Sequence, residues 1–373
     1  MYVIIIFLMM NDTQIQFLEL LRSALWGTTP DAGLFGNADW SGIYRMACEQ
    51  TVAALLVDAI ARLPHGMMPP LGVKMRFIAD ATMTGRRNRA VGEDMKRVWR
   101  LLEDNGIKVA FFKGQIAAAR YPHPEHRTPG DVDFIADCPA GAEMLMMAEG
   151  GKEGGVVPKH AEIMMDDVLF ESHRMALDMA FPPSMSYFNR LIARMFAENR
   201  GSESVEGCAL PCLPPLLELC HCTAHINHHF LEVGIGLRQL ADFALLLARK
   251  HDCVNPEELK IHLRGIHMLR FFRALEALSV DYLGLPKEAL VMPFSDSDRT
   301  NARLIMFSAV KGGNFGRYDG KDKSNGYRRL LLSIGNALRF FRLSPLEALF
   351  RPTMTLRVWV QVHLATFSEQ KGA

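Results

Sequence analysis

The spacing of hydrophobic residues changes twice along this chain, and this limits the possible folds more than any other feature. From residue 11 to about 105, and again from Ser184 almost to the end, apolar residues recur every three or four positions, which is typical of α-helices. Between these regions lie five short runs typical of β-strands: IKVAFF (107–112), DVDFIA (131–136), HAEIMM (160–165), VLFE (168–171) and HRMALDMAF (173–181). We therefore expect an α+β fold, predominantly α-helical, with a small mixed sheet and flanking helical regions.

The same spacing predicts the domain organisation. With 373 residues, 49% of them hydrophobic, the chain can build two or three modest cores. We expect a tail or misassigned start over 1–10, an N-terminal helical region over 11–105, an α/β core over 106–183 and a C-terminal helical domain over 184–373. The first ten residues, MYVIIIFLMM, are about half the length of a bilayer span, so no transmembrane segment is expected.

Composition narrows the compartment and the partners. The formal net charge is +1, which gives no general reason to expect nucleic-acid binding. Residues 321–357 carry eight Lys or Arg and two acidic residues, so contact with nucleic acid or anionic lipid stays open without being favoured over a solvated helix face. The seven cysteines are scattered and odd in number, which favours a reducing, cytoplasmic location. Nothing in the sequence sets the oligomeric state.

The stretch RTPGDVDFIAD (127–137) carries the strongest chemical signal. Residues two apart on a strand point to the same face, so Asp131 and Asp133 would lie side by side. Like charges in that position repel each other unless a cation lies between them, and a divalent metal such as Mg²⁺ or Mn²⁺ fills that role. The alternative is a solvated turn in which Asp131 merely follows Gly130.

Four motifs in order resemble one family. FFKGQIAAARYPHPEHRTPGDVDFIAD resembles the Lys-Gly, Tyr-Pro, Arg, Gly-Asp-x-Asp signature of an uncharacterised nucleotidyltransferase family in the DNA-polymerase-β-like superfamily. LLELCHCTAHINHHF, GIGLRQLADFALLL and GGNFG are similar to its later motifs, and together they cover roughly 45–345. Two features depart from the superfamily. Lys113-Gly114 stands where Gly-Ser or Gly-Gly is usual, and the interval from Gly114 to Asp131 is longer.

The resemblance implies a minimal nucleotidyltransferase fold that transfers a nucleoside monophosphate from an NTP, with ATP as the expected donor, to an unknown hydroxyl or amine acceptor. It implies that Asp131 and Asp133 hold Mg²⁺ or Mn²⁺. A third carboxylate, Asp178, would activate the acceptor or complete the metal site, unless it is a solvent-facing edge-strand residue. Lys113, the Gly114 amide and Arg127 would bind the triphosphate.

Several downstream residues keep two interpretations. His221 or His225 would contact substrate or orient Asp131, but a zinc site in the helix 214–230 and ordinary helix-interface histidines stay open. Arg238 would face the cleft or form an ion pair with Asp242 one helical turn away. The glycine-rich segment 311–326 is either a flexible connection or a lid over the nucleotide.

A second class of function is a catalytically inactive member of the fold. Such a chain would act as a binding or regulatory module, as an antitoxin-like partner or an accessory to polysaccharide assembly. The two hypotheses differ in the third carboxylate, because only an enzyme requires an acidic side chain beside the aspartate pair.

Overall fold

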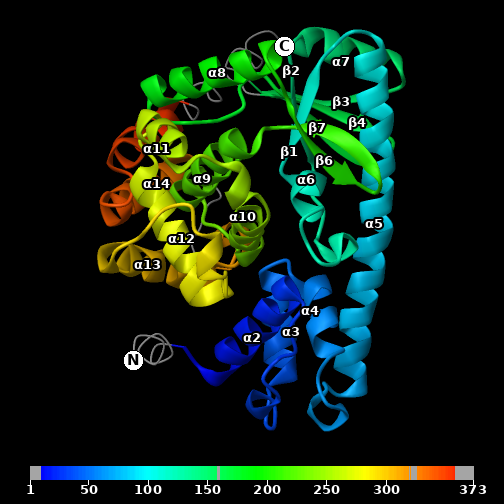
Figure 1. The fold of residues 1–373 in the computed structure, drawn as a ribbon, viewed down its shortest axis with the longest axis vertical. Coiled ribbons are helices and arrows are strands. Elements are labelled where there is room, and N and C mark those ends of the chain that lie inside the picture. Colours follow the sequence, from blue (N-terminus) through cyan, green and yellow to red (C-terminus); the bar gives the residue numbers. More distant parts are fainter. Residues whose placement is uncertain (1–9, 158–159, 319, 321–325, 358–373) are drawn as a thin grey trace.

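The fold was analysed in a computed structural model, which describes residues 10–157, 160–318, 320 and 326–357. Four helices come first, a seven-stranded sheet follows, and a helical region completes the described chain (Figure 1). The expectation of an α+β, predominantly α-helical fold is confirmed. Except for Met10, the predicted tail over 1–10 lies outside the described residues.

The N-terminal helices begin and end where local signals indicate. The helices are α2 Asp12–Trp26, α3 Trp40–Glu49, α4 Ala53–Ile60 and α5 Leu71–Asp104. Asn11 caps α2, and its side chain accepts a hydrogen bond from the Gln14 amide, which satisfies one of the free N–H groups of the first turn. Thr51, with φ +56°, separates α3 from α4.

The sheet has the strand order β3-β4-β5-β2-β1-β7-β6. Its strands are β1 Val109–Phe112, β2 Val132–Ala136, β3 Lys152–Val157, β4 His160–Met165, β5 Val168–His173, β6 Gly201–Val205 and β7 Cys208–Cys212. The central pair β1 and β2 is antiparallel, whereas β2 runs parallel to β5 and β1 parallel to β7. The sheet is therefore mixed, as expected.

The prediction of a strand over 173–181 was wrong, because β5 ends at His173 and residues 174–181 form an irregular segment. Two strand regions were missed. KEGGVV forms β3, and β6 and β7 form a hairpin. Its turn residues Glu206 and Gly207 have φ of +47° and +75°, as the tight two-residue turns of hairpins require. The sheet thus extends beyond residue 183.

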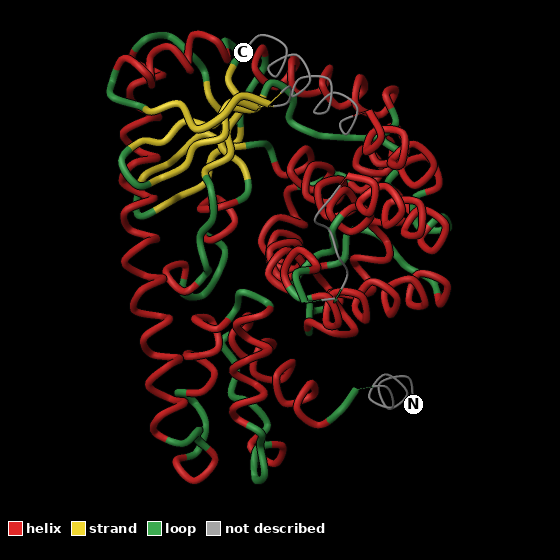
Figure 2. Tube along the Cα trace, turned by 180° about the vertical axis from the view of Figure 1, so that it is seen from behind, coloured by secondary structure: helices red, strands yellow, loops and turns green. Residues whose placement is uncertain are grey.

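The two faces of the sheet pack against different partners. Val91, Met95 and Val98 of α5 join Phe111 and Phe134 in one core, which also receives α7 Pro139–Ala148. The opposite face contributes a few residues to the larger core of the helical region. Figure 2 shows the strands gathered along the upper half of α5, with most C-terminal helices beside them.

Helix α8 Pro182–Ala197 lies between β5 and β6 in the chain. The helices after the last strand are α9 Pro215–Glu232, α10 Leu237–Lys250, α11 Pro256–Gly265, α12 Leu269–Leu283, α13 Asp296–Gly312 and α14 Gly326–Phe340. No helix within the described ranges combines the length and apolar character that a membrane crossing needs. All seven cysteines are free thiols, while the cytoplasmic location stays a prediction.

A buried ion network joins the sheet to the helical region. The guanidinium of Arg120, just after α6 Gly114–Ala118, donates to both carboxylate oxygens of Glu218 on α9 at 2.7 Å. It also donates to Glu203 of β6 at 3.0 and 3.1 Å, and Lys250 of α10 lies 3.1 Å from that carboxylate. Arg120 is 4% exposed and Glu218 5%, so neither charge has water as an alternative partner.

Replacing Arg120 by Met should therefore destabilise the fold strongly. The substitution leaves two carboxylates facing each other with only Lys250 nearby, and breaking a buried pair costs about 3–5 kcal/mol. Urea denaturation measures the free energy of unfolding. The matched control is Lys260→Met, which removes a surface pair with the 77% exposed Glu257 and should cost less than about 1 kcal/mol. Equal losses in the two variants would contradict the assigned role of the network.

Candidate active site

A cavity of about 380 Å³ lies between the sheet and helices α9 and α10. This volume falls within the range of small-molecule sites, roughly 300–1,000 Å³. Every site residue predicted from the sequence lines it: Lys113, Gly114, Arg127, Asp131, Asp133, Asp178, His221, His225 and Arg238. The structure brings these residues together, while their roles stay predictions.

Strand alternation and register bring three carboxylates to one edge of this cavity. Along β2, Val132 and Phe134 enter the core under α5, so Asp133 points to the opposite face, and Asp131 precedes the strand on the same side. Residue Asp133 is in register with Glu171 of the parallel neighbour β5. Because residues in register project from the same face, Glu171 lies beside the aspartates.

Asp133 is paired with two cationic groups. Its Oδ1 lies 2.7 Å from the Lys113 ammonium and 2.8 Å from His173 Nε2, and the residue is 4% exposed. Burial alone would raise the pKa of Asp133, but Lys113 and His173 together hold it well below the usual range. Asp133 is therefore a permanent anion at neutral pH.

Asp131 has the opposite character. It lines the cavity and is exposed to solvent, yet partial loss of hydration and the negative charges of Asp133 and Glu171 raise its pKa to about 6. Glu171 itself lies 3.3 Å from His173 and 3.7 Å from His160 of β4. We call Asp131, Asp133 and Glu171 the carboxylate edge. Its negative charge is not fully balanced by neighbouring cationic side chains, and the raised pKa of Asp131 reflects this excess.

The turn between β1 and α6 packs against the carboxylate edge. Lys113 adopts φ +59°, a left-handed conformation that is costly for a residue with a side chain. Gly114 has φ +41°, and a Cβ added there would lie 3.3 Å from the carbonyl oxygen of Asp131. Only glycine fits this close approach without displacing the backbone that carries Asp131.

The two predicted arginines differ in their partners. Arg127 forms a bidentate pair with Asp242 at 2.7 and 2.8 Å, and the Tyr121 hydroxyl donates to the same carboxylate at 2.7 Å. Asp242 therefore binds Arg127, and no ion pair with Arg238 occurs among the described residues. Arg238 donates one hydrogen bond to the Thr128 carbonyl, and its buried Nε has no partner. It is the cavity arginine best placed to bind an added anion.

Helix α9 places a row of neutral imidazoles along the cavity. Burial and the positive charge of Lys113 lower the pKa of His221 to about 3, and burial places that of His225 well below its usual range. His221 contacts Phe112, with ring centroids 4.7 Å apart. In the part of the chain described, no histidine of α9 belongs to a group of three ligand atoms close enough for one ion, so zinc binding there has no support.

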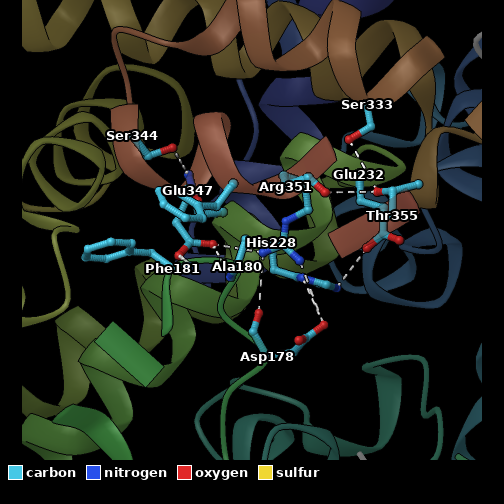
Figure 3. Close-up of polar contacts among 12 residues, drawn as sticks. Asp178, Ala180, Phe181, His228, Glu232, Ser333, Ser344, Glu347, Arg351 and Thr355 are labelled. Atoms are coloured by element: carbon cyan, nitrogen blue, oxygen red, sulfur yellow. Dashed lines mark hydrogen bonds and ion pairs between the residues drawn. The ribbon is translucent and has the colours of Figure 1, made fainter. Parts of the chain in front are cut away.

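Asp178 lies on the irregular segment after β5, not on a strand. Its Oδ2 is 3.5 Å from His228 Nδ1 and 3.8 Å from the Arg351 guanidinium (Figure 3). Arg351 also binds Glu347, whose carboxylate accepts hydrogen bonds from the backbone amides of Ala180 and Phe181. Residues 345–357 are helical. The contacts of Glu347 and Arg351 from this helix hold the segment that carries Asp178 in place.

Comparison with known proteins identifies the family. The sequence model of a family described as "Uncharacterised nucleotidyltransferase" matches residues 36–284, well over half of the chain. This chain belongs to the uncharacterised nucleotidyltransferase family. The match includes every predicted site residue and ends before the helical segment that anchors Asp178.

Other comparisons add little to this family assignment. No curated protein matches the sequence. Among solved structures, an antigenic nucleotidyltransferase-like protein from Paracoccidioides brasiliensis matches at 13% identity with a TM-score of 0.32. That alignment covers 53% of this chain and 92% of the other.

For this nucleotidyltransferase family member, sequence reasoning missed Glu171 and His173. Both lie in VLFESH, and its first four residues were predicted to be a strand. The available signal was alternation, because Val168, Phe170 and Ser172 are buried while Leu169, Glu171 and His173 point to the other face. A carboxylate on that face of a strand beside β2 is a natural third acidic residue.

Asp131→Asn should raise the melting temperature of the metal-free protein at pH 8. The pKa of Asp131 is raised from 3.8 to about 6, so ionisation of this carboxyl lowers the stability of the folded protein. The loss of stability is complete above pH 6 and absent below about pH 4. We expect a gain on the order of 2 °C at pH 8 that disappears near pH 4. Thermal denaturation in a chelator measures it.

The matched control is Asp252→Asn, which neutralises an 89% exposed carboxylate. It should not change the melting temperature at pH 8 or at pH 4. Added Mg²⁺ should stabilise the wild type at pH 8 and have little effect on Asp131→Asn. A lower melting temperature for Asp131→Asn in the chelator at pH 8 would contradict the repulsion described for this edge.

Proposed function

We propose that this chain is a Mg²⁺- or Mn²⁺-dependent nucleotidyltransferase that transfers a nucleoside monophosphate from an NTP, with ATP as the expected donor, to a hydroxyl or amine acceptor. The observation that carries the proposal is the carboxylate edge itself. Asp131, Asp133 and Glu171 meet beside the Lys113-Gly114 turn, on the wall of a ligand-sized cavity. The family assignment supports the same reaction class.

The residues present fit a divalent cation. Carboxylate oxygens are the ligands that Mg²⁺ prefers, and the raised pKa of Asp131 reflects an excess of negative charge that such an ion would neutralise. Asp131 and Asp133 would hold it, and Glu171 would complete the set. When bound, the ion would neutralise charge on the phosphate oxygens.

The remaining groups would bind and orient the nucleotide. Lys113 and Arg238 would contact the triphosphate, because one lies on the carboxylate edge and the other has an unsatisfied Nε. Arg127, paired with Asp242, would position the segment leading to Asp131. Neutral His221 and His225 would donate or accept hydrogen bonds without adding positive charge.

The transfer requires a base for the acceptor. We propose that Asp178, oriented by His228 and Arg351, accepts the proton of the acceptor hydroxyl or amine (Figure 3). The acceptor oxygen or nitrogen would form a bond to the α-phosphorus, the bond from that phosphorus to the bridging oxygen would break, and pyrophosphate would leave. An inactive binding module is the less favoured alternative, since it would not need this full set of acidic side chains.

Variants separate the assigned roles. Asp133→Asn should abolish Mg²⁺-dependent NTP binding, because it removes the permanent anion of the edge. Glu171→Gln should weaken Mg²⁺ binding.

Asp178→Asn should leave NTP binding intact while turnover falls about 10²–10⁴-fold, as expected for loss of a general base. Calorimetry with Mg-ATP measures binding, and release of pyrophosphate from each NTP in the presence of cell extract measures turnover.

The control is Asp252→Asn, which should match the wild type in both assays. Unchanged Mg-ATP binding in Asp133→Asn would overturn the metal assignment. Loss of Mg²⁺ binding in Asp178→Asn would instead make Asp178 a metal ligand. If no α-labelled NTP gives a labelled product with Mg²⁺ or Mn²⁺, alone or with extract, the inactive-module alternative gains.

A further inference from the structure

We propose a second metal site, of the zinc type, formed by Asp58, His123 and His126. These residues lie outside the cavity described above and play no part in the proposed transfer. Asp58 belongs to α4, whereas the two histidines lie in the connection from α6 to β2, His126 at the end of the short helix Pro124–His126. In Figure 1 this connection descends from α6 toward the N-terminal helices.

The ligand atoms are already close together. His126 Nδ1 lies 2.8 Å from Asp58 Oδ2, and His123 Nε2 lies 4.0 Å from Asp58 Oδ1. One ligand atom from each of the three residues lies within 4.8 Å of the other two. Two imidazoles and one carboxylate are a common donor set for Zn²⁺, with a fourth position left to water.

A simple ion pair accounts for only part of this arrangement. The pair with Asp58 explains the position of His126, but His123 lies beyond hydrogen-bonding distance of Asp58 and has its ring stacked beside that of His126, with centroids 5.6 Å apart. On its other side, His123 Nδ1 faces Glu125 Oε1 at 3.7 Å. A metal-bound histidine commonly donates its other ring N–H to a carboxylate, and Glu125 would have to approach by a few tenths of an ångström to accept it.

The backbone that carries the histidines is held in place independently of any metal. Asn88 of α5, which is 5% exposed, donates to the carbonyl oxygens of Glu125 and Arg127 at 2.7 and 2.9 Å. Gln115 of α6 donates in turn to the Asn88 side chain at 2.8 Å. The ligands therefore need little ordering to bind an ion, which favours affinity.

An ion at this site would connect the N-terminal helices to the active-site wall. Its two histidines precede Arg127, and the same segment continues through Gly130 to Asp131. Zinc would fix α4 against this segment and so stabilise the N-terminal helices on the core. Imidazole ligands make the site selective for zinc over Mg²⁺, which prefers oxygen.

Calorimetric titration of the full chain with Zn²⁺ in excess Mg²⁺ tests the site. We expect one ion per chain in the wild type, and at least about 10-fold weaker binding in His123→Ala and in Asp58→Asn. Co²⁺ should give the visible absorption of a low-coordinate site in the wild type and lose it in His123→Ala. His123 is 44% exposed, so this variant should fold, as circular dichroism in a chelator would verify.

Two matched variants locate the ion. His173→Ala disrupts the other two-histidine and carboxylate group, His160, Glu171 and His173, and should leave this Zn²⁺ binding unchanged. His251→Ala removes a histidine that pairs with a single exposed carboxylate and should also have no effect. Unchanged affinity in His123→Ala, or loss in His173→Ala alone, would overturn the proposal.

Discussion

Repulsion among three carboxylates on one face of β2 and β5 is the constraint on which the rest of the site depends. The parallel register of the two strands brings Asp133 and Glu171 together, and the glycine turn before α6 brings Lys113 above them. Lys113 and His173 balance the charge of Asp133, while Asp131 keeps a raised pKa. The folded protein therefore carries an unbalanced charge that a cation would relieve, which is the electrostatic preparation expected of a metal site.

The walls of the cavity are held by long-range ion pairs because they come from distant parts of the chain. Arg120 fixes α6 to α9 through Glu218, and Arg127 fixes the segment before β2 to α10 through Asp242. The Glu347–Arg351 pair holds the third wall, residues 174–181, against the C-terminal helical segment. These pairs are largely buried, so the cost of removing their charges from water offsets much of their attraction, although loss of one partner alone is strongly destabilising.

The spacing of hydrophobic residues within short windows of sequence predicted the elements that such windows determine. The helical period and the alternation of DVDFIA were enough for the helices, for β2 and for the shared face of Asp131 and Asp133. The prediction of a strand over 173–181 failed because its apolar residues are buried in a loop. The backbone amides of Ala180 and Phe181 in this loop donate hydrogen bonds to Glu347, which is 166 positions from Phe181 along the chain. Glu171 was missed because its importance comes from pairing with β2, which no local window contains.

Lys113 shows how a departure from the usual glycine-rich turn can be accommodated. A left-handed φ at a residue with a side chain costs on the order of 1–3 kcal/mol and persists only where the surroundings require it. Here the side chain returns a 2.7 Å contact to buried Asp133, which would otherwise depend on His173 alone for its counter-charge. Under the proposed function, the ammonium would hold the carboxylate edge together until a metal ion and triphosphate bind. It would then turn from Asp133 to the phosphate oxygens, so the strained turn would suit both the empty and the loaded site.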